Sequence, residues 1–197
     1  MSLLATIIYY FGFVKGSFLL FSGIAGALSG AIPLFSFILA ILFLKDEKIN
    51  TFSFLGVIIG FFGVLLISGV LNENILNSNI EGMIYMLVGS LSIGASFIYA
   101  KKYIIPLNIP IAALTTYQLG FALLILSVIT DFNNINNIWS SFHVSIGLVL
   151  GLGLLGTGLA YILYYYIVEN LGAIKASSAT YIPPIVALLI GSLIVGE

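Results

Sequence analysis

The 28 residues 17–44, SFLLFSGIAGALSGAIPLFSFILAILFL, contain no charged side chain. An α-helix rises 1.5 Å per residue, so about 20 apolar residues are enough to cross a hydrocarbon core of about 30 Å. This stretch can therefore span a bilayer, and its excess length predicts that it tilts, kinks or emerges from the membrane.

The composition of the whole chain agrees with a membrane protein. Of its 197 residues, 61% are hydrophobic and 7% are charged, whereas soluble domains average roughly 25% charged residues. The net charge of −1 excludes the basic surface that nucleic-acid binding requires. The chain has no cysteine, and its one histidine, His143, has no neighbouring Cys or carboxylate cluster. We therefore expect no metal site, no cofactor and no catalytic group.

Charged and Asn-rich clusters divide the chain into seven apolar stretches, and six of them are long enough to cross a membrane. No segment alternates apolar and polar residues as a barrel strand would. The sequence therefore predicts an all-α, polytopic membrane helix bundle. The first stretch is too short, and we interpret it as the tail of a span whose beginning is missing. The stretches are 2–14, 17–44, 52–70, 82–100, 104–130, 143–168 and 173–196.

The lysines predict the orientation of the spans, because basic residues resist translocation and collect in cytoplasmic loops. Five of the six lie in three loops that are two crossings apart, so all three loops fall on one side. Lys15 is the exception, and we place it on the outer side. The five cytoplasmic lysines are Lys45, Lys48, Lys101, Lys102 and Lys175.

Two parts of the chain, 150 residues apart, have a proline and a glutamate at the same spacing. Residues 30–33 (GAIP) lead to Glu47, 14 positions after the proline, and residues 180–183 (TYIP) lead to Glu197 at the same spacing. Five crossings separate the two prolines, and an odd number reverses direction. The pattern predicts inverted five-helix repeats, a hallmark of secondary transporters. We assign 1–79 to part of the first repeat and 80–197 to the second.

The motifs of both parts resemble the EamA-like family of the drug/metabolite transporter superfamily. In the second part these are GTGLAY (156–161), YYY (164–166), ASSATYIP (176–183) and GE (196–197); in the first, ALSGAIPLF (27–35) and FLKDE (43–47). The resemblance implies ten helices, cytoplasmic termini and a central cavity that works by alternating access. Compared with this ten-helix arrangement, the chain contains about helices 3–9, and its second repeat lacks the last helix.

The matching prolines are the main candidates for the substrate path. A proline inside a helix frees the carbonyl four residues earlier, and in lipid such a group is tolerated only where protein or a water-filled cavity satisfies it. Broken segments at matching places in two halves point to a transporter's substrate site; the alternative is a simple kink in a packed helix. These candidates are Pro33, Ser29, Thr180, Pro183 and Pro184.

Further candidates come from polar and aromatic residues inside the spans. Gln118, next to Tyr117, lies mid-span and should face the bundle interior, where it meets either substrate or a neighbouring helix. Tyr161 is a cavity candidate, whereas Tyr164–Tyr166 are better explained as an aromatic belt at the cytoplasmic end. Ser92, Ser96 and Tyr99 share one helix face, which either lines the path or bonds to backbone.

Glu47 and Glu197 end matching helices, and the family resemblance adds weight to these two carboxylates. The alternative is that each is an ordinary solvated carboxylate at the membrane interface. No charged residue lies deep within a predicted span, so the chain shows no proton or ion relay.

The leading hypothesis is therefore a multi-pass secondary transporter of small metabolites in the cell membrane, and not an enzyme. Its partners are a small-molecule solute and the lipid bilayer; a homodimer is compatible with the sequence. One alternative is a membrane-embedded enzyme, although no nucleophile–base pair or metal cluster is visible. A second is a non-transporting membrane subunit, if the chain is complete as given.

Overall fold

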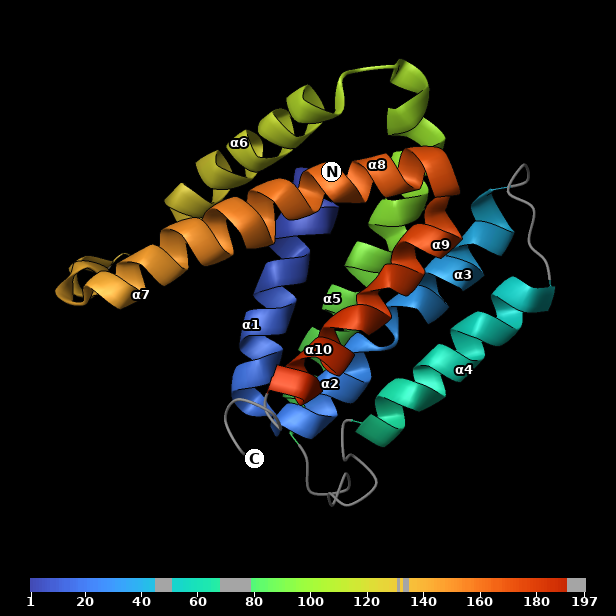
Figure 1. Ribbon diagram of the computed structural model, residues 1–197, viewed down its shortest axis with the longest axis horizontal. Coiled ribbons are helices and arrows are strands. Elements are labelled where there is room, and N and C mark those ends of the chain that lie inside the picture. Colours follow the sequence, from blue (N-terminus) through green and yellow to red (C-terminus); the bar gives the residue numbers. More distant parts are fainter. Residues whose placement is uncertain (45–50, 68–78, 131, 133–134, 191–197) are drawn as a thin grey trace.

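All regular structure in the described part of this computed structural model is helical (Figure 1). The structure describes residues 1–44, 51–67, 79–130, 132 and 135–190. Five described helical segments are long and apolar enough to cross a membrane, which confirms the prediction of an all-α polytopic bundle. They are Ser2–Leu19, Gly23–Phe43, Ile80–Leu107, Ile111–Ile129 and Phe142–Leu171.

Several of these segments are built from more than one kind of helix. The π-helical stretch η1 (Ser2–Ile8) runs into α1 (Tyr9–Leu19), and α5 (Ile80–Tyr99) continues through η4 (Ala100–Ile104) and η5 (Ile105–Leu107). The remaining elements in chain order are α2 (Ser22–Ser29), α3 (Ile32–Phe43), α4 (Thr51–Ile67), α6 (Ile111–Ile129), η6 (Ile135–Ser140), α7 (Phe142–Ile146), η7 (Gly147–Leu159), α8 (Ala160–Leu171), α9 (Ala173–Ser178), η8 (Ala179–Tyr181) and α10 (Ile182–Ile190).

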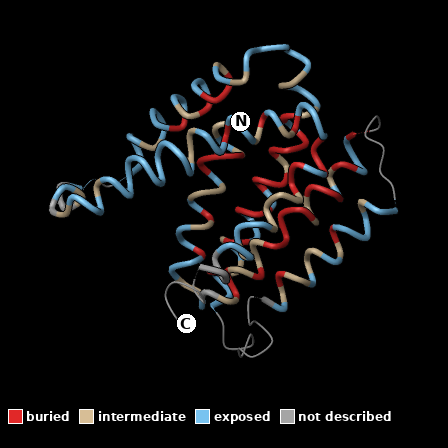
Figure 2. Tube along the Cα trace, viewed as in Figure 1, coloured by how far each residue is buried: buried red, intermediate tan, exposed pale blue. Residues whose placement is uncertain are grey.

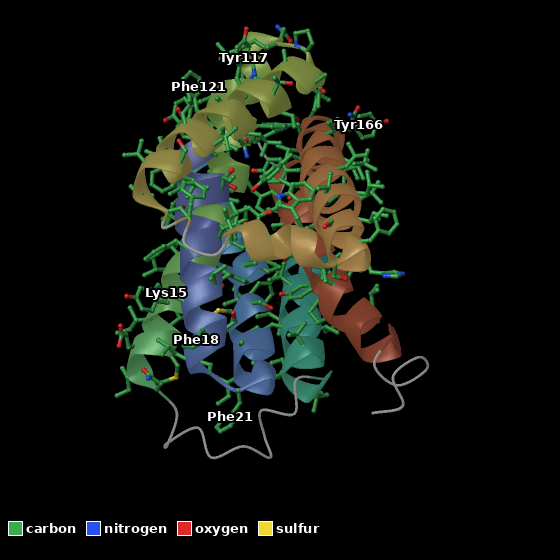
Figure 3. All side chains as sticks on the ribbon, turned by 90° about the vertical axis from the view of Figure 1, so that its left-hand side faces the viewer. Lys15, Phe18, Phe21, Tyr117, Phe121 and Tyr166 are labelled. Carbon is green, nitrogen blue, oxygen red and sulfur yellow. The ribbon has the colours of Figure 1, made fainter. Side chains whose placement is uncertain are left out.

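The first helix is longer than the predicted stretch 2–14, because Lys15 does not end it. The helix continues to Leu19 and ends where Leu20 and Phe21 adopt extended backbone. Lys15 is exposed near the end of this helix (Figure 3). Its long side chain can keep the ammonium group in water while its methylene groups cover apolar surface. Lys15, which follows the predicted stretch 2–14, thus lies inside a helix and near its end.

The stretch 17–44 is divided twice. After the extended residues, α2 begins at Ser22, and a tight turn at Gly30 and Ala31 separates it from α3. In this turn the Gly30 N–H donates to the carbonyls of both Gly26 and Ala27, at 3.3 and 3.1 Å. Pro33 then stands in the first turn of α3, where its missing N–H leaves no intrahelical bond unmade. Of tilting, kinking and emergence, which the excess length left open, the structure shows a break in the helix, and Pro33 begins the second part instead of lying inside one helix.

The predicted start of the 104–130 span was also wrong. Pro106 lies in η5, Pro110 precedes α6, and Asn108 between them has a left-handed backbone with φ of 52°. Two prolines so close together interrupt the helical ladder of N–H donors. The polypeptide therefore turns at 108–110, and α6 begins only at Ile111.

Glycines allow α1 and α5 to approach closely at the centre of the bundle. A Cβ added at Gly12 would lie 2.6 Å from the carbonyl oxygen of Tyr85 and 3.1 Å from the Cα of Gly89. Small residues at such contacts let dispersion forces hold helices together in lipid, where the hydrophobic effect gives no drive. A Cβ added at Gly60 would likewise overlap the ring of Tyr181, whereas one added at Gly147 or Gly151 would meet no atom within 4 Å outside its own helix backbone.

The lysine-bearing turns of the described chain meet at one end of the bundle. The ammonium of Lys101 donates to the carbonyls of Val168 and Glu169, the last turn of α8, at 3.3 and 3.1 Å. The ammonium of Lys102 lies 5.7 Å from the ring centre of Phe43, the last residue of α3. Thus α3 ends and α9 begins at the same end, and these two helices run antiparallel (Figure 1). Lys45 and Lys48 lie outside the described residues.

Burial is concentrated where α1, α3, α5 and α9 pack together (Figure 2). By contrast, α6 and the long rod formed by α7, η7 and α8 cross over one end of this bundle and are largely exposed (Figures 1 and 2). The rod contacts the bundle mainly at its inner end, through α8. The core of the molecule is therefore the part that contains the turn between α2 and α3 and the start of α9.

Candidate functional site

A cavity of about 490 Å³ lies in this core, and its lining comes from α1, α2, α3, α5, η7, α8, η8 and α10. Its described lining is dominated by aromatic and small residues, and none of these residues carries a charge. The lining residues are Tyr9, Tyr10, Phe13, Gly26, Ser29, Ile32, Ile93, Phe97, Gly156, Ala160, Tyr161, Tyr164, Thr180, Pro183 and Pro184.

Two interruptions of regular α-helix open onto this cavity: the turn between α2 and α3, and the 3₁₀ turn η8 between α9 and α10. We call these the two helix breaks. Ser29 and Ile32 flank the turn between α2 and α3, and both line it. Thr180 comes from η8, the 3₁₀ turn between α9 and α10, and Pro183 follows it in the first turn of α10. In membrane proteins, irregular backbone at membrane depth is found where it is covered by protein or faces a cavity. The two breaks that the prolines predict thus meet at one place.

Six aromatic rings form the walls of the cavity. On α1, the rings of Tyr9 and Tyr10 lie 5.0 Å apart between centres, and those of Tyr9 and Phe13 lie 4.6 Å apart. From α8 and α5, the ring of Tyr164 lies 4.7 Å from that of Phe97 and 5.9 Å from that of Tyr161. Offset and tilted pairs at these distances are the favourable arrangement for aromatic rings. The rings therefore hold one another in place around the open volume.

A chain of buried hydrogen bonds ends at the cavity. The Tyr165 hydroxyl donates to Oε1 of Gln118, and Nε2 of Gln118 donates to Oγ1 of Thr6 at 3.0 Å. Thr6 then donates to the hydroxyl of Tyr161 at 3.4 Å, and Tyr161 donates to the carbonyl of Ala5. These bonds connect α8, α6 and η1, three elements far apart in the sequence. They fix the position of Tyr161, which belongs both to this series of hydrogen bonds and to the wall of the cavity.

Of the substrate-path candidates, the structure brings five to the cavity: Ser29, Tyr161, Thr180, Pro183 and Pro184. Pro33 is buried beside it at the start of α3 but does not line it. Gln118 faces the interior as predicted and is only 3% exposed, but its side chain bonds to neighbouring helices. Tyr117 is 65% exposed and points outward from α6, as does Phe121 (Figure 3). Glu47 and Glu197 lie outside the described residues.

The aromatic-belt interpretation of Tyr164–Tyr166 is wrong for two of the three residues. Tyr164 lines the cavity, and Tyr165 is 1% exposed and bonded to Gln118. Only Tyr166 points away from the bundle (Figure 3). The physical reason is that a tyrosine with a hydroxyl partner is as well placed in a core as at an interface, and its partners here come from distant helices.

The serine face of α5 has the second of its two predicted roles. Ser92 donates to the carbonyl of Leu4 at 2.7 Å, and Ser96 donates to the carbonyl of Ile93 at 2.6 Å. Ser96 also lies 3.0 Å from the hydroxyl of Tyr164. These serines therefore support the cavity wall from behind, while Tyr99 is partly exposed further along the helix.

Sequence reasoning missed the α1 wall of the cavity. The first predicted stretch, interpreted as the tail of a span, contains three of the lining residues, Tyr9, Tyr10 and Phe13. Phe97 has no polar group that would mark it as a site candidate in the sequence. One clue was available, because residues 7–10 (IIYY) echo 162–165 (ILYY), and Tyr164 is a lining residue. His143, for which the sequence indicates no metal role, is exposed on α7. No group of three or more possible metal ligands gathers in the described residues.

Comparison with known proteins gives relatives with transporter names. The chain is 29% identical over 178 residues to "Uncharacterized inner membrane transporter YedA" of Escherichia coli (strain K12), covering 89% of the chain and 55% of that protein. It is 28% identical over 171 residues to "Uncharacterized transporter YoaV" of Bacillus subtilis (strain 168), covering 86% of the chain and 57% of the relative. A third relative, an "Uncharacterized transporter" of Archaeoglobus fulgidus, is 26% identical over 190 residues, which is 96% of the chain and 65% of the relative.

The chain thus spans about half the length of the first two of these relatives. No solved structure matches it significantly. The sequence pattern of the EamA-like transporter family matches residues 80–197, which is more than half of the chain. The protein is an integral membrane protein that belongs to the EamA-like transporter family.

Proposed function

We propose that the chain forms the solute-binding core of a secondary transporter of small metabolites in the cell membrane. The observation that carries this proposal is the meeting of two helix breaks at one cavity, whose lining includes Ser29 from the first break and Thr180 from the second. Broken helices at matching places in two halves are typical of the substrate sites of such transporters. One relative is named an inner membrane transporter, which supports the location.

The direction of the broken helices supports an inverted repeat and, with it, alternating access. Gly30 and Thr180 stand at equivalent positions when the sequence is shifted by 150 residues, and each lies at a helix break. At this shift α9 is the counterpart of α2, and α2 belongs to the same membrane-capable segment as α3. The antiparallel course of α3 and α9 therefore supports an inverted relation between the two breaks. In this mechanism one repeat rocks against the other, so that the cavity opens first to one side of the membrane and then to the other.

The size and lining of the cavity favour a small organic solute. Cavities of about 300–1,000 Å³ hold metabolite- and drug-sized ligands, and this one has about 490 Å³. An enzyme would need a nucleophile with its base, or a metal cluster. The lining instead offers rings and hydroxyls, which suit binding and release better than bond-breaking.

Solute counterflow into proteoliposomes tests this proposal. We expect the reconstituted chain to exchange a labelled metabolite from a small-molecule panel, and the variant Ser29→Leu to lose the exchange because the larger side chain occupies the cavity. Ser127→Leu is the matched control. Ser127 lies on α6 and donates to the carbonyl three residues earlier, at 2.8 Å, as Ser29 does at 2.7 Å, but it is exposed away from the cavity.

Equal exchange by Ser29→Leu and Ser127→Leu would contradict the assignment of this cavity as the solute site. Absence of exchange across a broad panel in the unmodified chain would contradict transport by the chain itself. That second outcome would favour a non-transporting membrane subunit.

A further inference from the structure

A second cavity, of about 330 Å³, adjoins the first one and lies between α1 and α2. One lining residue, Met86, comes from α5. The others are Phe13, Val14, Ser17, Ala25, Gly26 and Ser29. Three residues, Phe13, Gly26 and Ser29, line both cavities. The two cavities therefore meet at this part of the wall.

The space between α1 and α2 follows from how these helices pack. Both lie against α5, and they contact each other far less than they contact α5. The part of α2 that lines the second cavity carries only small side chains, those of Ala25, Gly26 and Ser29. Small side chains on one wall leave room that larger ones would fill.

The second cavity leads from the middle of the bundle toward the end opposite Lys101. A Cβ added at Gly82, near the start of α5, would lie 2.9 Å from the Cβ of Leu19, so the last turn of α1 lies beside the start of α5. Lys101 follows the other end of α5. In the second half of α1, Val14 is 65% exposed and Ser17 is exposed as well. These two residues therefore form the mouth of the second cavity.

The first cavity is packed on the side toward Lys101. Along α8, Tyr165 follows the lining residues in the direction of the carbonyls that Lys101 binds, and its hydroxyl donates to Gln118. Gln118 donates in turn to Thr6, which precedes the lining part of α1. The side chains of Tyr165, Gln118 and Thr6 are all buried. The first cavity thus ends against bonded side chains on one side and continues into the second cavity on the other.

We infer that a solute reaches the first cavity from the end opposite Lys101, by way of the second cavity between α1 and α2. The lysine pattern predicts that this end is the outer one. Phe13 and Ser29 lie where the cavities meet, and the Phe13 ring packs on that of Tyr9, with 4.6 Å between centres. The ring of Phe13 therefore limits the size of the solute that passes. This inference adds a route to the proposed solute site and rests on that proposal.

An open route fits the second cavity better than an empty gap in the packing. The lining of a void loses its dispersion contacts on one side, so a sealed and empty space of this size is costly. A cavity with exposed residues at its mouth avoids this cost by admitting water. The hydroxyls of Ser17 at the mouth and Ser29 at the junction can bond to that water.

Thiol labelling at two matched alanines tests the route. Ala25 lines the second cavity, whereas Ala27, two positions later on α2, packs with Ile24 in a separate apolar cluster. The two alanines are similarly buried, 8% and 5% exposed, and the chain has no cysteine of its own. In oriented vesicles, a small, charged, membrane-impermeant methanethiosulfonate added on the side opposite Lys101 should modify Ala25→Cys and leave Ala27→Cys unmodified.

Filling the mouth tests whether the route leads to the first cavity. Ser17→Trp places a large ring at the mouth and should prevent the same reagent, added on the same side, from reaching Thr180→Cys. Ser127→Trp is the matched control and should leave this labelling unchanged. Ser127 is exposed on α6, and its hydroxyl donates to the carbonyl three residues earlier at 2.8 Å, as that of Ser17 does at 3.3 Å. Equal helical circular dichroism of the two variants excludes a folding defect as the cause.

The inference is overturned if Ala25→Cys and Ala27→Cys react alike, if Ala25→Cys reacts only from the Lys101 side, or if the two tryptophan variants label equally at Thr180→Cys. An unreactive Ala25→Cys would mean that lipid or protein fills the second cavity. Failure of transport is a separate result. The expected labelling without solute counterflow would leave the route standing and contradict the proposed function. Counterflow with an unreactive Ala25→Cys would do the reverse.

Discussion

The hydroxyl of Tyr165 on α8 donates its proton to Oε1 of Gln118 on α6, and both side chains are buried. From there the hydrogen bonds continue through Thr6 to Tyr161 at the cavity wall. This contact joins the two helices that cross over the end of the bundle, and it connects them with the lining of the candidate solute site.

Removing the Gln118 side-chain amide should therefore destabilise the chain. Gln118→Leu removes the acceptor of the Tyr165 hydroxyl and the donor to Oγ1 of Thr6. We expect a loss of about 1 kcal/mol in the free energy of unfolding, since single polar contacts in membrane proteins contribute about 0.6 kcal/mol. Unfolding in detergent, followed by circular dichroism, measures the change. In the double variant with Tyr165→Phe the loss should be less than the sum of the two single losses, because each single change already breaks the same bond. Additive losses would contradict the bond.

The close approach of α1 and α5 predicts a different outcome for two glycine variants. Gly12→Ala would place a methyl group 2.6 Å from the carbonyl of Tyr85, so the helices must separate, and overpacking of this kind costs about 1–3 kcal/mol. At Gly120 in α6, an added methyl group would meet no atom within 4 Å, so Gly120→Ala should be neutral or stabilise by up to about 1 kcal/mol through helix propensity. Unfolding in detergent compares the two. Equal effects would show that α1 and α5 are not in contact at Gly12.

The arrangement of the loops predicts which positions react from each side of the membrane. The chain contains no cysteine, so single cysteines can be introduced without other changes. Asn108 and Asn170 lie at the end of the bundle marked by Lys101, and Asn79 precedes α5 at the opposite end. In oriented vesicles, an impermeant maleimide should label Asn108→Cys and Asn170→Cys from the cytoplasmic side and Asn79→Cys from the outside. Labelling of all three from one side would contradict the predicted topology.

Much of the fold could be predicted from the sequence because lipid imposes few solutions. An uncharged stretch such as 17–44 must form a helix, and Pro33 and Pro183 indicate where two of the helices break. Helix ends were less predictable: Lys15 is tolerated inside a helix because its side chain can extend to water, and Pro110 delays α6 until Ile111.

The composition of the site was harder to predict, because it depends on which helices meet. Gln118 was recognised as interior from its polarity, yet its partners Thr6 and Tyr165 lie 112 and 47 residues away in the sequence. Tyr164 and Tyr166 are identical in type and two positions apart, but one lines the cavity and the other faces outward. Only packing distinguishes them.

The central claim is that the break at Thr180 faces a solute cavity that opens to each side of the membrane in turn. Its most direct test is the labelling of Thr180→Cys by an impermeant maleimide, applied from either side of oriented vesicles with and without a transported solute. The account predicts labelling from both sides and protection by solute. Labelling from one side only, unchanged by solute, would contradict it.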